Sequence, residues 1–121
     1  MKWRSTPGLL QCGSSPVAER IARLWQGRVR THQAGAYLNL MRSVAIPDYR
    51  AVPGNLAAYA LSREEGQITH VLMLTFWESL DAIRTFAGDD VEAAKYYDFD
   101  HDYLLDFPAK ATHYVMEGDA R

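Results

Sequence analysis

The chain has 121 residues, a length that suits one domain built around one hydrophobic core. Hydrophobic residues make up 48% of it and charged residues 23%, which is ordinary for a globular protein. Because the formal net charge is −2 and no apolar run approaches the roughly 20 residues that span a bilayer, we expect neither nucleic acid nor a membrane as a partner.

Residues 1–18 are rich in Ser, Gly and Pro, and we expect them to form a flexible extension before the domain. They contain no apolar segment of the kind that a secretion signal needs. The single cysteine of the chain, Cys12, cannot form an internal disulfide. We therefore expect a cytoplasmic protein. Its domain is expected at residues 19–117, followed by a short tail at residues 118–121.

The first expected elements are a strand over Glu19–Arg30 and the helix that follows it. In the strand, Arg23 and Trp25 fall on the same face because side chains alternate. Apolar residues then recur with the period of an amphipathic helix, with Thr31 as its N-cap and its end just before Pro47. The apolar stripe of this helix is Ala34, Tyr37, Leu38, Met41, Val44 and Ala45.

A turn at Pro53-Gly54 leads into two further expected strands, Asn55–Arg63 and Gln67–Trp77. The hairpin loop between them, residues 64–66, ends on a glycine suited to the left-handed conformation. The second of these strands is apolar on both faces, which predicts a central strand covered on both sides. One face carries Val71, Met73, Thr75 and Trp77, and the other carries Leu72, Leu74 and Phe76.

A second helix is expected to begin after the N-cap Ser79 and to end at Gly88. The remaining segments are less regular: a short helical turn over Val91–Tyr97, irregular chain over Asp98–Tyr103 and a last strand over Pro108–Glu117. The apolar stripe of the second helix is Leu80, Ile83, Phe86 and Ala87.

This order of elements, β-α-β-β-α-β, predicts an α+β domain with a four-stranded antiparallel sheet in the ferredoxin-like arrangement. Two helices can cover only one face of such a sheet. The other face keeps half of an apolar central strand, and an exposed apolar sheet of that size is rare on a monomer. We therefore expect a homodimer in which a second copy covers the bare face.

Six segments of the predicted domain together carry a resemblance to a known family. They are Ile21-Ala22-Arg23-Leu24-Trp25-Gln26-Gly27-Arg28, Pro47-Asp48-Tyr49-Arg50-Ala51-Val52-Pro53-Gly54-Asn55, Leu74-Thr75-Phe76-Trp77-Glu78-Ser79-Leu80-Asp81-Ala82-Ile83, Phe86-Ala87-Gly88, Tyr96-Tyr97 and His113-Tyr114. Together they resemble the antibiotic biosynthesis monooxygenase family within the dimeric α+β-barrel superfamily. The resemblance covers about residues 19–117, and it implies a homodimer whose sheets pack into a barrel, with a pocket between sheet and helices in each subunit.

The activity that this resemblance implies is that of a cofactor-independent monooxygenase on a small aromatic, polyketide- or quinol-like molecule. The alternative is a non-catalytic dimeric barrel that binds a small molecule or serves a stress response, because one fold hosts many functions. Heme-degrading relatives use an Asn on the first strand, a Trp and a His. Here Glu19–Arg30 contains no Asn, and Phe86 and Tyr96 stand at the other two positions, so we expect no heme degradation.

Two residues are candidates for catalysis. His113 is the expected base because an unperturbed imidazole titrates near neutral pH, and Arg23 is the expected anchor for a phenolate. Each residue also has a structural alternative: His113 could hydrogen-bond at a dimer interface, and Arg23 could pair with an acidic residue. The residues expected to line the substrate pocket are Trp25, Tyr59, Trp77, Tyr96 and Tyr97.

No metal site is expected. His101 lies among Asp98, Asp100 and Asp102, but the spacing matches no known metal loop, and such carboxylates are usually solvated. Phosphate-binding glycine loops and the Gly-x-Ser-x-Gly elbow are missing from the sequence as well.

Overall fold

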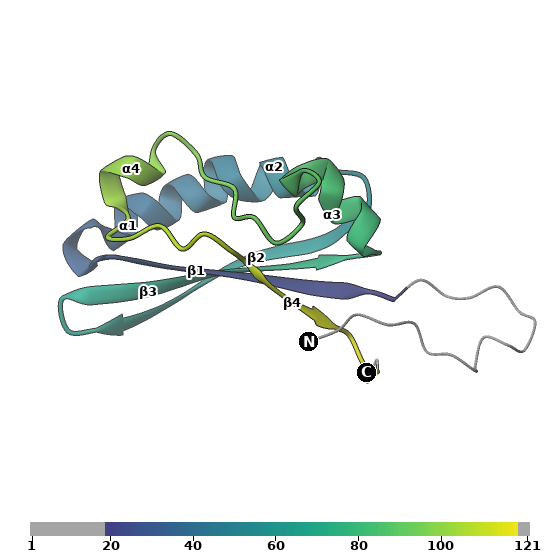
Figure 1. Ribbon diagram of the computed structural model, residues 1–121. Coiled ribbons are helices and arrows are strands. Elements are labelled where there is room, and N and C mark those ends of the chain that lie inside the picture. The colour runs from purple at the N-terminus through teal and green to yellow at the C-terminus, as the bar shows by residue number, and fades with distance from the viewer. Residues whose placement is uncertain (1–18, 119–121) are drawn as a thin grey trace, which may run out of the picture.

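The computed structural model describes residues 19–118 of the chain (Figure 1). The expected extension at residues 1–18, with Cys12, and residues 119–121 of the expected tail lie outside the described part. Among the described residues, no helix is both long and apolar enough to cross a membrane. The elements are β1 (Ile21–Arg30), α1 (Thr31–Leu40), η2 (Met41–Ala45), α2 (Ile46–Arg50), β2 (Asn55–Glu65), β3 (Ile68–Trp77), α3 (Leu80–Ala87), α4 (Asp100–Tyr103) and β4 (Thr112–Val115).

The four strands form one antiparallel sheet in the order β2-β3-β1-β4. The helices all lie on one side of it, above the sheet in Figure 1. This arrangement confirms the predicted ferredoxin-like α+β fold. β3 lies inside the sheet between β2 and β1, as its apolar character predicted, but within the described chain the helices cover only one of its two faces.

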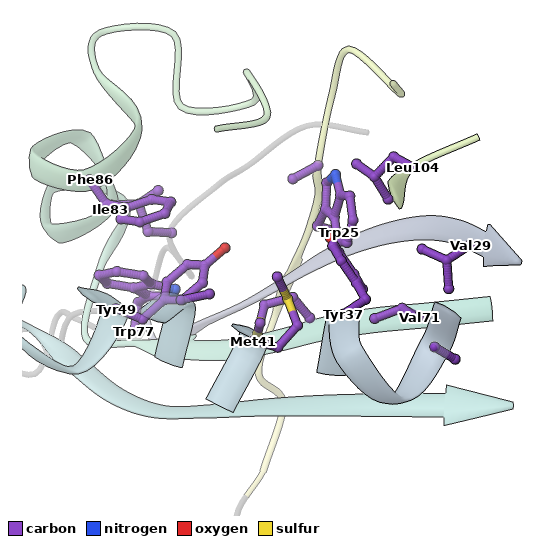
Figure 2. Packing of buried hydrophobic residues seen from close by; sticks show 14 of the residues in the cluster. Trp25, Val29, Tyr37, Met41, Tyr49, Val71, Trp77, Ile83, Phe86 and Leu104 are labelled. Carbon is purple, nitrogen blue, oxygen red and sulfur yellow. The ribbon is translucent and has the colours of Figure 1, made fainter. Parts of the chain in front are cut away.

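Alternate residues of β1 and β3 face the helices and form the floor of the core, because side chains on a strand alternate between its faces. On β1 the buried set includes Trp25 and Val29, and on β3 it includes Val71 and Trp77. Figure 2 shows two groups of aromatic rings above this floor, one around Tyr49 and the other around Trp25.

The first helix runs farther than the sequence predicted. It does not end before Pro47 but passes through a π-helical turn, η2, and continues as α2 to Arg50. In this turn the Ile46 N–H donates to the Met41 carbonyl five residues back. The wider turn accommodates Pro47, which has no N–H to donate, and so the proline does not stop the helix. The turn also shifts the helix phase, which leaves the predicted core residue Val44 exposed.

Other local predictions hold. The β2–β3 hairpin turns at Gly66, whose φ of 62° is left-handed. The Ser79 hydroxyl caps α3 by accepting from the Ala82 N–H at 3.2 Å, and Gly88 ends the helix at φ 91°. Thr31 is not the N-cap of α1; it is the first helical residue, and its hydroxyl bonds to that of Thr69 at 2.9 Å.

The connection between α3 and α4, residues 88–99, differs from its prediction. No helical turn forms over Val91–Tyr97, and the helix α4 lies within the segment expected to be irregular. The connection instead runs beside the chain that leads into β4. There the Ala94 N–H donates to the Ala109 carbonyl at 2.9 Å and the Ala111 N–H to the Glu92 carbonyl at 2.8 Å. These bonds hold the connection over the helix-facing side of the sheet.

The opposite side of the sheet, here called the open face, is largely apolar, and no helix of the described residues covers it (Figure 1). Residues opposite one another in the register place these side chains together, as in the pairs Leu24–Leu74 and Leu61–Leu72. Within the described chain nothing covers them, and Tyr59 and Tyr114 keep about half of their surface exposed. The apolar residues of the open face include Ala22, Leu24, Tyr59, Leu61, Leu72, Leu74, Phe76 and Tyr114.

Candidate functional site

A cavity lies between the helix-facing side of the sheet, the long first helix and the α3–α4 connection. Its walls are mainly aromatic rings and methionines, and Lys95 and Asp100 are its charged members. Its volume of about 10 Å³ holds roughly one water molecule, so a larger ligand requires the walls to move. The lining residues are Trp25, Tyr37, Met41, Ala45, Tyr49, Met73, Lys95, Tyr97 and Asp100.

The π-helical turn explains how one helix supplies four of these residues. Tyr37, Met41, Ala45 and Tyr49 are spaced by four, and all are buried. In a regular α-helix, three steps of four residues would rotate the side chains by about 120° in total. The wider turn at 41–45 lowers the rotation per residue and brings the set back to one face. A π-turn inside an α-helix is frequent at functional sites, and here it forms the cavity wall.

Trp25 is positioned by a glycine two residues later on the same strand. A Cβ atom on Gly27 would lie 2.3 Å from the Trp25 ring, so only glycine leaves room for the indole. The indole Nε1–H donates to the Tyr96 hydroxyl at 3.3 Å, and the two rings meet edge to face. Tyr96 in turn donates to the Pro108 carbonyl. Tyr96 therefore supports the cavity wall without lining the cavity.

Asp100 forms the polar end of the cavity. It is 2% exposed, and its Oδ1 accepts from the Tyr37 hydroxyl at 2.8 Å while its Oδ2 accepts from the Tyr97 N–H at 2.7 Å. Burial raises the pKa of the Asp100 carboxyl, and the two donors partly oppose that effect. Burial and the neighbouring Asp100 raise the pKa of Tyr37, which therefore keeps its proton and acts as a donor.

The mouth of the cavity is closed by contacts to Asp48 on α2. The Tyr97 hydroxyl donates to Asp48 Oδ2 at 2.6 Å, and Lys95 Nζ lies 3.3 Å from the same oxygen. The Tyr97 hydrogen bond, followed by Lys95, lowers the pKa of Asp48. The Lys95 ammonium also lies 4.4 Å from the centre of the Phe86 ring. We call Asp48, Lys95 and Tyr97 the latch, because they tie the connection to the first helix.

Solved structures with the same fold include two bacterial proteins that carry the provisional name antibiotic biosynthesis monooxygenase. The protein from Nitrosomonas europaea is 14% identical, with 82% of this chain and 91% of that chain covered at a TM-score of 0.62. The protein from Bacillus cereus is 11% identical, with coverages of 86% and 99% and a TM-score of 0.60. A monooxygenase from Streptomyces coelicolor, in complex with the ligand nanaomycin D, is 20% identical, with coverages of 86% and 92% and a TM-score of 0.53.

The chain has the fold of the antibiotic biosynthesis monooxygenases. No family model matches its sequence, and no curated protein matches it either. The structural likeness thus confirms the fold that the sequence resemblance implied, while substrate and catalysis have to be argued from the site itself.

Arg23 and His113, the two candidates for catalysis, lie opposite each other on β1 and β4 and face the helices. Neither lines the cavity. Arg23 is 2% exposed and donates to the Ala93 carbonyl at 2.7 Å, and its guanidinium lies over the Phe86 ring. Burial lowers the pKa of Arg23, while the adjacent Tyr49 raises it. Arg23 therefore acts on the cavity from behind its wall, through neighbours such as Tyr49 that line it.

His113 is a weak base in this setting. Burial, followed by the nearby Arg23 charge, lowers its pKa to about 4. At neutral pH the imidazole is uncharged, and its low pKa disfavours proton abstraction from a phenol or enol. In the folded chain His113 therefore does not keep the near-neutral pKa of an unperturbed imidazole.

The five residues expected to line the pocket divide into three groups. Trp25 and Tyr97 line the cavity, while Trp77 and Tyr96 lie behind its wall. Trp77 is fully buried and donates from Nε1 to the Thr75 hydroxyl at 2.8 Å. Tyr59 lies on the open face and is 55% exposed, so its predicted place in the pocket is wrong.

Of the nine lining residues, only Trp25 and Tyr97 were predicted, and the missed ones include Tyr37, Tyr49 and Asp100. Tyr37 appeared only as part of the apolar stripe, and Asp100 was taken for a solvated loop carboxylate. A signal for Asp100 was present, because it shares one helical face with Tyr97 and Leu104 at i−3 and i+4. In the described chain, no three His, Cys, Asp or Glu side chains gather as a metal site would require.

Proposed function

We propose that this chain is a cofactor-independent monooxygenase that acts on a small aromatic, polyketide- or quinol-like molecule in the cavity. The observation that carries the proposal is the composition of the cavity. Aromatic rings provide flat stacking area, and the buried Asp100–Tyr37 pair provides a polar end inside an apolar shell. The fold shared with monooxygenases is consistent with this use of the site.

A cofactor-independent monooxygenase needs a substrate that can supply all of the electrons that reduce O₂. A base removes a proton from an activated phenol or enol, and the resulting carbanion passes an electron to O₂. Recombination and loss of water then convert a CH₂ group and O₂ into a C=O group and H₂O. The four electrons that reduce O₂ all come from the substrate, so this chemistry needs no cofactor.

In this proposal the two buried residues of the neighbouring strands are positioning residues. Arg23 holds the connection through the Ala93 carbonyl and supports Tyr49 in the wall. His113, opposite Arg23 in the register, packs as a neutral side chain at the same end of the sheet. Trp25 and Tyr97 form the aromatic walls, and Tyr96 supports Trp25.

Oxygen uptake with an anthrone as substrate tests the proposal. The wild type is expected to consume O₂ well above the rate of spontaneous oxidation. Ala45→Leu fills the cavity and should remove most of that activity, whereas Ala36→Leu, the same change at an exposed site of the same helix, should leave it intact. Near-ultraviolet circular dichroism confirms that both variants fold. A wild-type rate equal to the spontaneous rate, or full activity in Ala45→Leu, contradicts the proposal.

A second candidate function is a non-catalytic barrel that binds a small molecule. The weak basicity of His113 favours this candidate, because binding needs no base. The two candidates differ in one observable, because a binding protein takes up the aromatic molecule without consuming O₂. Measuring the binding of an aromatic substrate analogue by calorimetry, together with the oxygen uptake, separates the two candidates.

We also propose that a second copy of the chain covers the open face, giving a homodimer. Leu72, Leu74 and Phe76 of the central strand lie on this face, and large side chains of the outer strands extend it. Covering such a surface with its own symmetric copy removes apolar area from water on both subunits.

A further inference from the structure

Asp100 is a carboxylate in a place where carboxylates are rarely found. It is 2% exposed, and aspartate is almost never fully buried unless its charge has partners. It also lines the cavity rather than the protein surface, together with the aromatic ring of its own donor Tyr37. A buried charge at a cavity wall is costly to desolvate, and its presence there indicates a functional role.

The two donors described for Asp100 leave part of its capacity unused. An ionised carboxylate can accept about four hydrogen bonds, and Tyr37 and the Tyr97 N–H account for two. Both donors also fix its orientation. Tyr37 is fully buried in α1, and the Tyr97 ring is parallel to the Phe99 ring, with their centroids 5.4 Å apart. The carboxylate is thus held rigidly, with acceptor capacity left for a ligand in the cavity.

The rest of the cavity restricts what that ligand can be. Aromatic rings and methionines line it, and the one positive charge, Lys95, lies at the mouth where it is tied to Asp48. An anionic group placed at Asp100 would meet a like charge in an apolar setting. A neutral hydroxyl on an aromatic ring, in contrast, donates a hydrogen bond to the carboxylate while its ring contacts the walls.

We infer that Asp100 recognises the hydroxyl group of a neutral phenol or enol in the cavity and accepts its proton in the reaction. In that step the ligand O–H bond breaks, a carboxyl O–H bond forms, and the electron pair remains on the ligand as phenolate or enolate. The raised pKa of the Asp100 carboxyl makes it a stronger base than an exposed aspartate. The inference rests on the proposed function in taking the same cavity as the ligand site.

Binding of a matched pair of ligands tests recognition without any turnover. In titration calorimetry the wild type is expected to bind 1-naphthol about ten- to a hundred-fold more tightly than 1-methoxynaphthalene, which lacks the donor hydrogen. Asp100→Ala should lose this preference and keep its affinity for the methyl ether. Asp102→Ala, an exposed position in the same short helix, should keep the preference and serves as the control.

Asp100→Asn provides a second variant of nearly the same shape. Its side-chain oxygen still accepts a hydrogen bond, but the amide cannot take a proton. We expect it to bind 1-naphthol within about ten-fold of the wild type and to lose at least a hundred-fold in kcat with an anthrone, with little change in KM.

The outcomes separate this inference from the proposed function. Three outcomes overturn the inference. The preference for 1-naphthol persists in Asp100→Ala, the wild type shows no such preference, or the wild type binds neither ligand. Full turnover by Asp100→Asn removes the proton-accepting role and leaves the monooxygenase standing. If the wild type shows the Asp100-dependent preference but consumes no O₂, the role of Asp100 in recognition is supported. The proposed monooxygenase activity, and with it the proton transfer to Asp100, is then refuted.

Discussion

Lowering the pH from 7 to 5 should destabilise the protein through His113. Its pKa in the folded chain is about 4, against 6.5 for an unperturbed imidazole. Below about pH 6.5 the unfolded chain therefore binds a proton that the folded chain refuses, and the free energy of unfolding falls as the pH falls toward 4. A difference of about 2.5 pH units, at 1.36 kcal/mol for each, corresponds to about 3 kcal/mol over the whole range.

The variant His113→Gln isolates this contribution because glutamine does not titrate. Urea unfolding followed by tryptophan fluorescence, at one protein concentration, gives the free energy of unfolding at pH 7, 6 and 5. We expect the wild type to lose about 2 kcal/mol more than the variant between pH 7 and 5. Asp100, whose raised pKa acts in the opposite direction, and Asp48 are present in both proteins and cancel in the comparison. Parallel stability curves for the two proteins would refute the reasoning about His113.

Three further predictions concern the latch, the packing of Trp25 and the open face. Asp48→Asn weakens the latch to Lys95 and Tyr97 and should speed the association of 1-naphthol in stopped-flow fluorescence; an unchanged rate counts against the latch. Gly27→Ala forces the Trp25 indole away and should lower the free energy of unfolding by about 1–3 kcal/mol, whereas Gly35→Ala, with open space around it, should not destabilise. Light scattering at low micromolar concentration should give a dimer mass for the wild type and a monomer mass for Leu74→Asp; a wild-type monomer rules the dimer out.

The expectation that the chain does not degrade heme stays a prediction. Phe86, at the position of the required Trp, packs on Tyr49 with ring centres 4.3 Å apart, and Tyr96 bonds to Trp25. Added hemin with a reductant should therefore keep its Soret absorbance. Loss of that band with release of iron would overturn the prediction.

The alternation of side chains along the strands was readable from the sequence. It correctly placed Arg23 and Trp25 on one face, because the period of two in a strand is strict and β1 has no irregularity. The structure adds His113 to this face, opposite Arg23 on β4. Tyr59 was misplaced for a physical reason. A bulge between Asn55 and Ala57 shifts the register of β2, so that Tyr59 lies opposite Leu74 on the open face. A single extra residue at the start of a strand leaves no clear mark in the sequence.

The cavity itself depends on two features that sequence periodicity does not reveal. The π-helical turn brings Met41 and Ala45 onto one face with Tyr49, against the period of an α-helix. Asp100 is recruited to the cavity by Tyr37, 63 residues earlier in the chain, so its burial follows from tertiary contacts. A local reading of its acidic segment favours a solvated loop, and only the fold shows otherwise.

The fate of isotope-labelled O₂ tests the central claim most directly. With an anthrone and the wild type, the account predicts that one O₂ is consumed for each substrate, with one labelled oxygen in the new carbonyl group and the other in water. Asp100→Asn should form this product at least a hundred-fold more slowly. Unlabelled product, hydrogen peroxide in place of water, or a rate no greater than that of the substrate in buffer alone would contradict a monooxygenase in this cavity.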